Sequence, residues 1–329
     1  IKNKKVMLKL VNKFSIVAVI FGASLFLSSC EDDDTSSDDD MMQKTIVEIA
    51  SDDDSFSILV EALTKADLVS TLDGEGPYTV FAPTNEAFEN LFATLGVDGI
   101  DDLSAEALTP ILLYHVVNTK AMSTDLENGY ITSMSTFTPD NAGASILVSL
   151  DDGVKLNGSS TVVSADLEAS NGVIHVIDEV ILPPSVVDIA TTNPNFSILV
   201  EALTKADLVG ALTDEGPFTV FAPTNAAFEA LFDELSVDGI SDLDAETLTP
   251  ILLYHVVGDN VTSSEVTSGM VPTLNTSAQL SIDASDAGVM LDDRASVITV
   301  DVQGTNGVVH AIDQVVLPST PGSFTLQSR

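Results

Sequence analysis

Phe56–Val117 reads FSILVEALTKADLVSTLDGEGPYTVFAPTNEAFENLFATLGVDGIDDLSAEALTPILLYHVV, and Phe196–Val257 repeats it with 13 substitutions in 62 positions. A second shared block, NGVIHVIDEVILP at Asn171–Pro183, returns as NGVVHAIDQVVLP at Asn306–Pro318. The two copies are offset by 140 residues in the first block and by 135 in the second. This period is far longer than the roughly 20–50 residues of solenoid repeats. The chain therefore contains one whole domain twice.

The length of 329 residues fits two domains of ordinary size. We expect the first domain over residues 45–184, the second over 185–320, and a short C-terminal tail over 321–329. Each domain is long enough to bury a hydrophobic core of its own.

The first 29 residues resemble a bacterial export signal. Five lysines lie within residues 1–13, and the apolar run FSIVAVIFGASLFL at Phe14–Leu27 is too short to span a membrane comfortably. The run ends in Leu-Ser-Ser-Cys, and Cys30 is the only cysteine of the chain. This ending resembles the lipobox of bacterial lipoproteins, which implies lipidation of Cys30 and a membrane partner reached through that lipid. The alternative is a spare thiol in a signal peptide that is removed whole.

Residues 30–44 form an acidic tether, with EDDDTSSDDD at Glu31–Asp40. A segment with so many like charges cannot collapse, and we expect it to be disordered. It also resembles the acidic tag after the lipidated cysteine of Bacteroidetes surface lipoproteins. That resemblance implies a position on the outer face of the outer membrane; an anchor facing the periplasm is the alternative.

The charge of the chain excludes several partners. Fifty acidic residues stand against 12 basic ones, for a net charge of −38. Such a surface repels phosphate backbones, so we expect no nucleic-acid partner. The same charge favours a soluble monomer. Because Cys30 is the only cysteine, the domains contain no disulfide bond, and their stability must come from packing.

The spacing of apolar residues predicts helices in the first half of each copy. Phe56, Leu59, Val60 and Leu63 lie on one helical face, and a second helix, capped by Thr84 or Asn85, follows a short buried strand. The pair Thr109-Pro110 predicts a third helix that begins there, with threonine as the N-cap and proline at the first helical position. The short strand between the first two helices covers Tyr78–Ala82.

The second half of each copy predicts β-structure. Apolar and polar residues alternate at Ser145–Leu150 and Thr161–Leu167, and Asn-Gly pairs mark turns. Val173–Leu182 is apolar on both faces, as expected of a central strand. Helices followed by a largely antiparallel sheet indicate the α+β class.

Three motifs resemble those of one known family. They are TVFAPTNEAF at Thr79–Phe88, the Tyr-His motif in Leu113–His115, and NGVIHVID at Asn171–Asp178, and all three recur in order in the second copy. They resemble the signature blocks of the fasciclin-like domain. The resemblance implies two tandem domains, each a seven-stranded β-sandwich or wedge with helices packed on it. Members of this family are extracellular or cell-surface proteins implicated in adhesion.

The same resemblance implies candidate ligand contacts in two places. One is the Tyr-His motif; the other is an Asp-Ile pair before the closing Asn-Gly, where this chain keeps the aspartate but has leucine or valine instead of isoleucine. The structural alternative is that the histidines are core residues satisfied by hydrogen bonds. The candidate contacts are Tyr114, His115, Asp166 and Leu167 in the first copy, and Tyr254, His255, Asp301 and Val302 in the second.

The sequence favours a binding protein over an enzyme. It contains no nucleophile elbow, phosphate-binding loop, dinucleotide fingerprint or zinc-protease motif, and we expect no catalytic residue and no cofactor. We also expect no metal site, with calcium at the acidic runs Asp52–Asp54, Asp151-Asp152 and Asp292-Asp293 as the alternative. The hypothesis is a lipid-anchored surface module that mediates adhesion to cells, matrix or polysaccharide, with an extracellular protein or polysaccharide as ligand. The alternatives are an envelope-organising lipoprotein without external ligand and a glycan-capture accessory for nutrient uptake.

Overall fold

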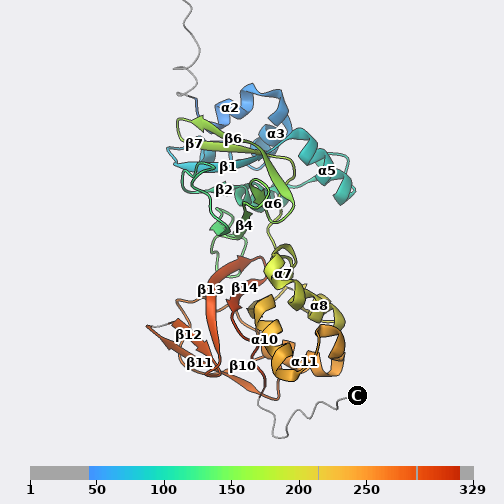
Figure 1. Cartoon of the computed structure of the whole chain (residues 1–329). Helices are drawn as coiled ribbons and strands as arrows, with labels where there is room; N and C mark the ends of the chain where they lie inside the picture. Colours follow the sequence, from blue (N-terminus) through green and yellow to red (C-terminus); the bar gives the residue numbers. More distant parts are fainter. Residues whose placement is uncertain (1–43, 214, 287, 319–329) are drawn as a thin grey trace, which may run out of the picture. The chain divides into compact units, whose positions relative to one another are not determined.

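The computed structural model describes residues 44–213, 215–286 and 288–318. The predicted export signal, Cys30, nearly all of the acidic tether and the C-terminal tail lie outside these residues. Each copy of the repeat contains its helices first and most of its strands afterwards (Figure 1).

The first copy contains α2 (Ile46–Asp52), η1 (Asp54–Phe56), α3 (Ser57–Lys65), α4 (Val69–Leu72), β1 (Tyr78–Pro83), α5 (Asn85–Leu95), η2 (Ile100–Asp102), α6 (Ala105–Tyr114), β2 (Val116–Val117), β3 (Gly129–Thr132), β4 (Ser145–Ser149), β5 (Lys155–Leu156), β6 (Ser160–Ala169) and β7 (Gly172–Ile177).

The second copy contains α7 (Val186–Thr192), η3 (Pro194–Phe196), α8 (Ser197–Lys205), α9 (Val209–Thr213), β8 (Phe218–Pro223), α10 (Asn225–Leu235), η4 (Ile240–Asp242), α11 (Ala245–Tyr254), β9 (Val256–Val257), β10 (Gly269–Pro272), β11 (Gln279–Ser285), β12 (Gly288–Leu291), β13 (Ala295–Gly304) and β14 (Gly307–Ile312).

Each copy builds one seven-stranded mixed sheet. The strand order is β2-β1-β7-β6-β5-β4-β3 in the first copy and β10-β11-β12-β13-β14-β8-β9 in the second. β1 and β7 pair in parallel, with Val80 opposite Ile174, and the other pairs are antiparallel. A parallel pair needs a long crossover connection, and here the whole middle of the domain provides it. The α+β prediction, with seven strands and packed helices in each tandem domain, is confirmed.

The sheet of the first copy packs on both faces. Along β1, Val80 and Ala82 belong to the core under the helices, while Phe81 belongs to a second core. This alternation follows from the two-residue period of a strand. The second core also contains Ile146 from β4 and Leu156 from β5, so residues from distant parts of the sheet meet there. The sheet is therefore a wedge, with helices outside it and an apolar filling between its two halves.

The predicted start of the third helix is wrong. α6 begins at Ala105, and the hydroxyl oxygen of Ser104 caps it by accepting the N–H of Ala107 at 3.2 Å. Thr109 lies inside the helix, where its hydroxyl donates to the Ala105 carbonyl at 2.8 Å. Pro110 removes one helical hydrogen bond, the one that its N–H would give to residue 106. That residue is exposed, so water can satisfy the freed carbonyl, which makes an interior proline tolerable.

The turn before β7 requires Asn171 and Gly172. The Asn171 side chain is buried; its oxygen accepts the N–H of Ile46 at 3.0 Å, and its amide donates to the carbonyl of Leu72 at 2.8 Å. A Cβ at Gly172 would lie 2.1 Å from the Tyr78 carbonyl oxygen, so only glycine lets β7 approach β1 this closely. β7 then ends at Ile177, five residues before the predicted end of the central strand.

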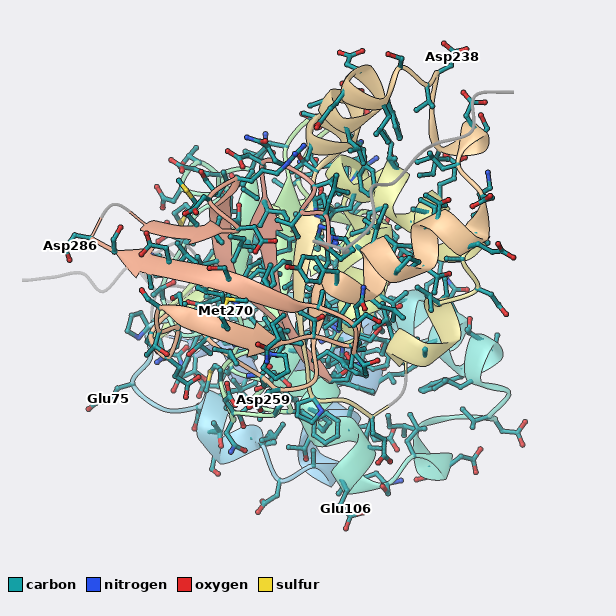
Figure 2. The ribbon with its side chains drawn as sticks, turned by 90° about the horizontal axis from the view of Figure 1, so that it is seen from below. Glu75, Glu106, Asp238, Asp259, Met270 and Asp286 are labelled. Atoms are coloured by element: carbon teal, nitrogen blue, oxygen red, sulfur yellow. The ribbon has the colours of Figure 1, made fainter. Side chains whose placement is uncertain are left out.

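The acidic residues of the described chain lie mainly on its surface. Figure 2 shows the side chains of Glu75, Glu106, Asp238 and Asp286 at the periphery of the ribbon, and all four are exposed. The two large cores of the first copy consist of apolar side chains with the ring of Tyr114. The excess of negative charge is therefore available to attract a cationic partner.

Candidate functional site

The Tyr-His motif is buried at the end of α6. Tyr114 is 0% exposed; its hydroxyl donates to the Ser145 carbonyl at 2.7 Å and accepts from the Asn157 amide at 2.9 Å. Burial raises the pKa of Tyr114 well above its usual value, with the Asn157 hydrogen bond lowering it slightly. The ring fills the wedge, and the hydroxyl joins the helix end to β4 and to the turn after β5.

His115, the next residue, connects two backbone segments. Its Nδ1–H donates to the Ile111 carbonyl at 2.8 Å, and its Nε2 accepts the N–H of Ile181 at 3.1 Å. One ring nitrogen must carry a proton and the other must not, so the neutral ring fits this position. Burial lowers the pKa of His115 to about 4, with the Ile111 carbonyl opposing that shift.

His175 uses the opposite tautomer. Its Nδ1 accepts the N–H of Asp166 at 3.2 Å, and its Nε2–H donates to the Ala121 carbonyl at 2.9 Å. The ring is 0% exposed and lies 5.6 Å from the ring of Phe81, centroid to centroid. The interpretation of the histidines as core residues satisfied by hydrogen bonds is confirmed for these two, and for His255 and His310 in the second copy.

The carboxylate of Asp166 binds a loop of its own chain. It lies at an irregularity of β6 with φ +63°, a left-handed conformation that aspartate adopts more readily than most residues. Its carboxylate accepts the N–H of Ser123 at 2.7 Å and the Ser123 hydroxyl at 2.5 Å. These hydrogen bonds, led by the hydroxyl, lower the pKa of Asp166.

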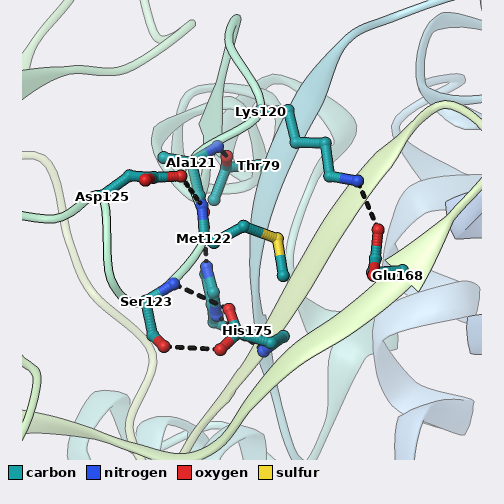
Figure 3. Close-up of polar contacts among 9 residues, drawn as sticks. Thr79, Lys120, Ala121, Met122, Ser123, Asp125, Glu168 and His175 are labelled. Atoms are coloured by element: carbon teal, nitrogen blue, oxygen red, sulfur yellow. Dashed lines mark hydrogen bonds and ion pairs between the residues drawn. The ribbon is translucent and has the colours of Figure 1, made fainter. Parts of the chain in front are cut away.

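Thr79 of β1 holds the same loop from the other side. Its hydroxyl donates to the Thr119 carbonyl at 2.6 Å and accepts the N–H of Ala121 at 2.8 Å. Figure 3 shows Thr79 and His175 beside Ala121 and Ser123 of this stretch of chain. We call Thr79, Asp166 and His175 the clasp, and residues 118–128 the clasped loop. The clasp fixes a long connection that has no regular structure of its own.

The second copy has the same clasp. Thr219 donates to the Asp259 carbonyl at 2.6 Å, and Asp301 accepts the N–H of Ser263 at 2.7 Å and also the Ser263 hydroxyl. His310 accepts the N–H of Asp301 at 3.2 Å and bonds the Val261 carbonyl at 2.9 Å. The two copies therefore hold equivalent loops with equivalent atoms.

The other two candidate contacts face the helices. Leu167 is half-buried against the core under the helices of the first copy, and Val302 is buried in the corresponding core of the second. The structure thus brings Asp166 next to His175, but it places the Tyr-His motif in the wedge core. Tyr114, His115, Tyr254 and His255 are each at most 3% exposed, so any part they take in binding must act through the backbone they hold.

The clasped loop forms one wall of a cavity that the sequence did not reveal. The cavity has a volume of about 500 Å³ and opens beside β1, β2 and β3. Its lining joins residues that are far apart in the sequence, so no local pattern could have indicated it. The lining residues are Thr79, Phe81, Val117, Thr119, Ala121, Asp125, Leu126, Glu127, Asn128, Gly129, Tyr130, Ile131 and Thr132.

Three carboxylates of the acidic runs named as calcium alternatives have partners within the chain. Asp52 pairs with Lys44 at 3.0 Å, Asp53 accepts the N–H of Ser55 at 2.8 Å, and Asp292 bonds the Tyr254 hydroxyl at 2.9 Å. Within the described ranges, no three histidine, cysteine or acidic side chains are grouped as metal ligands would be. The same residues include no helix with the length and apolar character needed to cross a membrane.

Comparison with known proteins identifies the fold family. The family profile "Fasciclin domain" matches residues 54–183 and again 194–318. The chain belongs to the fasciclin domain family. The two copies are hereafter fasciclin domain 1 and fasciclin domain 2.

Related sequences occur in bacteria and animals. Protein sll1483 of Synechocystis sp. is 47% identical over 141 residues, which cover 43% of this chain and 74% of that protein. Human periostin is 29% identical over 251 residues, covering 76% of this chain and 29% of periostin. Mouse stabilin-1 is 28% identical over 276 residues, and this chain spans only 10% of it. The chain thus spans less than a third of each of these two animal proteins.

Among solved structures, a FAS1 domain pair from the insect cell adhesion molecule fasciclin I is similar, with 19% sequence identity and a TM-score of 0.45. The match covers 82% of this chain and 95% of that structure.

Proposed function

We propose that this protein is a non-enzymatic binding module that mediates adhesion at the cell surface. Its membership of the fasciclin domain family, over both copies, carries the proposal. The polar network is consistent with it, because the buried histidines, Thr79 and Asp166 direct their hydrogen bonds to the chain's own backbone or to Ser123. Such groups build a rigid scaffold for a binding surface rather than a set of reactive side chains.

The ligand-binding surface, in this proposal, is the one that the candidate residues position. Asp166 and Asp301 hold loops, and Leu167 and Val302 anchor the same strands on the helical cores. The loops then present exposed polar side chains that differ between the domains. Connecting loops on a fixed scaffold are common binding surfaces in proteins. The motif residues would thus support contact with a partner without touching it.

A lipid on Cys30 would place both domains at the outer surface of the outer membrane. The lipobox-like ending of the export signal and the acidic segment after it support this location. Two similar domains on one tether would also raise avidity, since binding by one increases the effective concentration of the other. The ligand is an extracellular protein or a polysaccharide, and the proposal includes neither a cofactor nor a metal ion.

Binding of the lipid-free chain, from residue 31 onward, tests the proposal. We expect saturable binding to at least one of three surfaces: cultured cells, immobilised matrix proteins and a glycan array. A matched chain with both clasps weakened, Asp166→Asn and Asp301→Asn, should bind less while its helices remain folded. Absence of saturable binding on all three surfaces would contradict the proposal. An unstable envelope after gene deletion, with normal attachment, would favour the envelope-organising alternative.

A further inference from the structure

The cavity beside the clasped loop of domain 1 combines an apolar floor with an acidic rim. We propose that it binds a cationic side chain within an apolar segment of the protein partner. This inference rests on the proposed function and specifies the chemistry of its ligand. The floor and rim of the cavity, its rigid walls and a difference between the two domains support it.

The floor of the cavity is apolar. Ala121, Tyr130 and Ile131 are half-buried and supply its accessible surface, while Phe81 and Leu126, which also line it, are buried. A volume of about 500 Å³ lies within the range of sites that accept a small molecule or a few side chains. A floor of this kind accepts aliphatic groups, including the methylene stem of lysine or arginine, and gains free energy by removing them from water.

The rim of the cavity is acidic. Asp125 and Glu127 are both exposed, and both line the opening. One oxygen of Asp125 accepts the N–H of Met122 at 3.0 Å, which fixes its carboxylate and leaves the other oxygen available. Glu127 makes no hydrogen bond or ion pair within the described part of the chain. The nearby cation Lys120 is already paired with Glu168 at 2.6 Å, so the rim charge is not neutralised by it.

The combination of floor and rim selects the occupant. A lysine side chain can lay its stem on an apolar floor while its ammonium group meets carboxylates at the opening. A neutral polysaccharide lacks both the aliphatic stem and the positive charge. A chain with a net charge of −38 also attracts basic segments over a distance before contact. A basic and aliphatic protein segment therefore fits the cavity better than a neutral glycan.

The walls are already ordered for binding. The clasp fixes the loop at residues 119, 121 and 123, and the Asn128 side chain accepts the N–H of Leu150 at 2.7 Å beyond the far end of the opening. A site that is ordered before it binds loses less conformational entropy when the ligand arrives. The free energy of contact is then available as affinity.

The two fasciclin domains differ at this cavity. Thr267 stands in domain 2 where domain 1 has Glu127, and Pro272 stands where domain 1 has Thr132. The clasp is the same in both, so the change affects the rim and not the scaffold. The preference for a cation at this rim position therefore belongs to domain 1.

Fluorescence polarisation with defined peptides tests the inference on the lipid-free chain. The probe is a fluorescein-labelled pentapeptide of alternating leucine and lysine. We expect saturable binding, about tenfold weaker when the lysines are replaced by glutamine, which corresponds to about 1.4 kcal/mol. Replacement of the leucines by glycine should abolish saturable binding. Equal binding of the glycine peptide would overturn the inference, because attraction by net charge alone would then explain the affinity.

Variants of the protein locate the site. Glu127→Thr, which copies domain 2, should weaken probe binding about tenfold, and Thr119→Trp, at an exposed position of the lining, should block the cavity. Asp238→Asn removes one exposed charge from domain 2 and serves as the matched control, with less than a twofold effect. Equal losses in the Glu127 and Asp238 variants would overturn the inference.

The two proposals fail separately. If the peptide does not bind while the same chain still binds cells or matrix, the cavity inference is wrong and the adhesive function stands. If Thr119→Trp abolishes binding on the glycan array but not to the peptide, the cavity is a polysaccharide site and the inference is again wrong. Unchanged hydrogen exchange in β1 and β7 confirms that each variant is folded.

Discussion

Fasciclin domains 1 and 2 agree in the hydrogen bonds of their buried histidines and differ at the cavity rim and at the tyrosine hydroxyl of the wedge core. His115 and His255 make the same two bonds, at 2.8 and 3.1 Å in each domain. At the rim of the cavity, by contrast, Glu127 of domain 1 is replaced by Thr267 in domain 2. In the turn after β5, Asn157 is replaced by Asp292, which follows β12. The histidines that bond backbone groups are therefore retained, whereas the cavity rim and the partner of the buried tyrosine hydroxyl have changed. Three substitutions and one change of pH test this difference between the domains.

The largest effect is expected from removing a histidine of the Tyr-His motif. His115→Phe retains an aromatic ring but leaves the Ile111 carbonyl and the Ile181 N–H without their partner. Two buried unpaired groups should lower the free energy of unfolding of domain 1 by about 4 kcal/mol. Urea denaturation followed by peptide-resolved hydrogen exchange measures the effect for each domain. His255→Phe should weaken domain 2 in the same way; loss of ligand binding without loss of stability would instead indicate a contact residue.

Acid should destabilise both domains through the same histidines. Burial lowers the pKa of His115 and His255 to about 4, from their usual 6.5. Above pH 6.5 both rings are neutral whether the chain is folded or unfolded, so they contribute no pH dependence. Between pH 6.5 and 4 the unfolded chain takes up protons that the folded chain excludes, and the free energy of unfolding falls by about 3 kcal/mol per histidine.

Urea midpoints at pH 7, 5.5 and 4.5 measure this loss. Burial also lowers the pKa of His310, so domain 2 should lose additional stability over the acidic part of the range. His115→Gln is the matched control, because its amide can donate and accept like the neutral ring but does not titrate. A chain carrying His115→Gln that retained the full pH dependence of domain 1 would contradict the assignment.

Weakening the clasp should loosen the loop more than the domain. Asp166→Asn keeps a residue that tolerates φ +63° and one acceptor oxygen, but it loses the charged acceptor of the Ser123 hydroxyl. We expect a loss of about 2 kcal/mol, with faster hydrogen exchange over residues 119–126 and unchanged exchange in β7. Asp301→Asn should do the same in domain 2. Unchanged exchange in both loops would show that the clasp does not order them.

The helices and the core strands could be predicted from the sequence, because each depends on neighbours within a few residues. The predicted strand at Tyr78–Ala82 corresponds to β1. The spacing of Phe88, Leu91, Phe92 and Leu95 predicts the buried face of the next helix, and the first three are buried in α5. The prediction is wrong for Leu95, which is 47% exposed in the last turn of that helix. The clasp could not be predicted in this way. Thr79 binds Thr119, 40 residues later, and Asp166 binds Ser123, 43 residues earlier.

The helix α6 shows a different limit of local patterns. Thr109-Pro110 has the form of a helix start, yet Ser104 provides the cap and the proline lies inside the helix. The preceding residues, Ala105 to Leu108, favour helix and extend it backwards from the proline. A proline in an exposed turn loses one bond that water replaces, so its presence marks neither a start nor an end there. The cavity was missed for the same reason as the clasp, since its lining comes from separate segments.

The smallest expected effect concerns the tyrosine hydroxyl in each wedge. In domain 1 the Tyr114 hydroxyl donates to a carbonyl and accepts from the Asn157 amide, so every group has a suitable partner. In domain 2 the Tyr254 hydroxyl lies 3.0 Å from the Gln279 carbonyl and 2.9 Å from the Asp292 carboxylate. Both of these oxygens are acceptors, and one hydroxyl proton cannot serve both fully.

Asp292→Asn should therefore stabilise domain 2. The asparagine amide would donate to Tyr254, whose proton would then be free for the Gln279 carbonyl, and the gain should be about 1 kcal/mol. Asparagine also suits the φ of +52° at this position. The reciprocal change, Asn157→Asp, should destabilise domain 1 by a similar amount. Urea midpoints of the two single variants and of the double variant measure both effects, which should add because the sites lie in different domains. A destabilised Asp292→Asn chain would mean that the carboxylate serves domain 2 through its bond to the Ser281 N–H, and that the copies differ there for a structural reason.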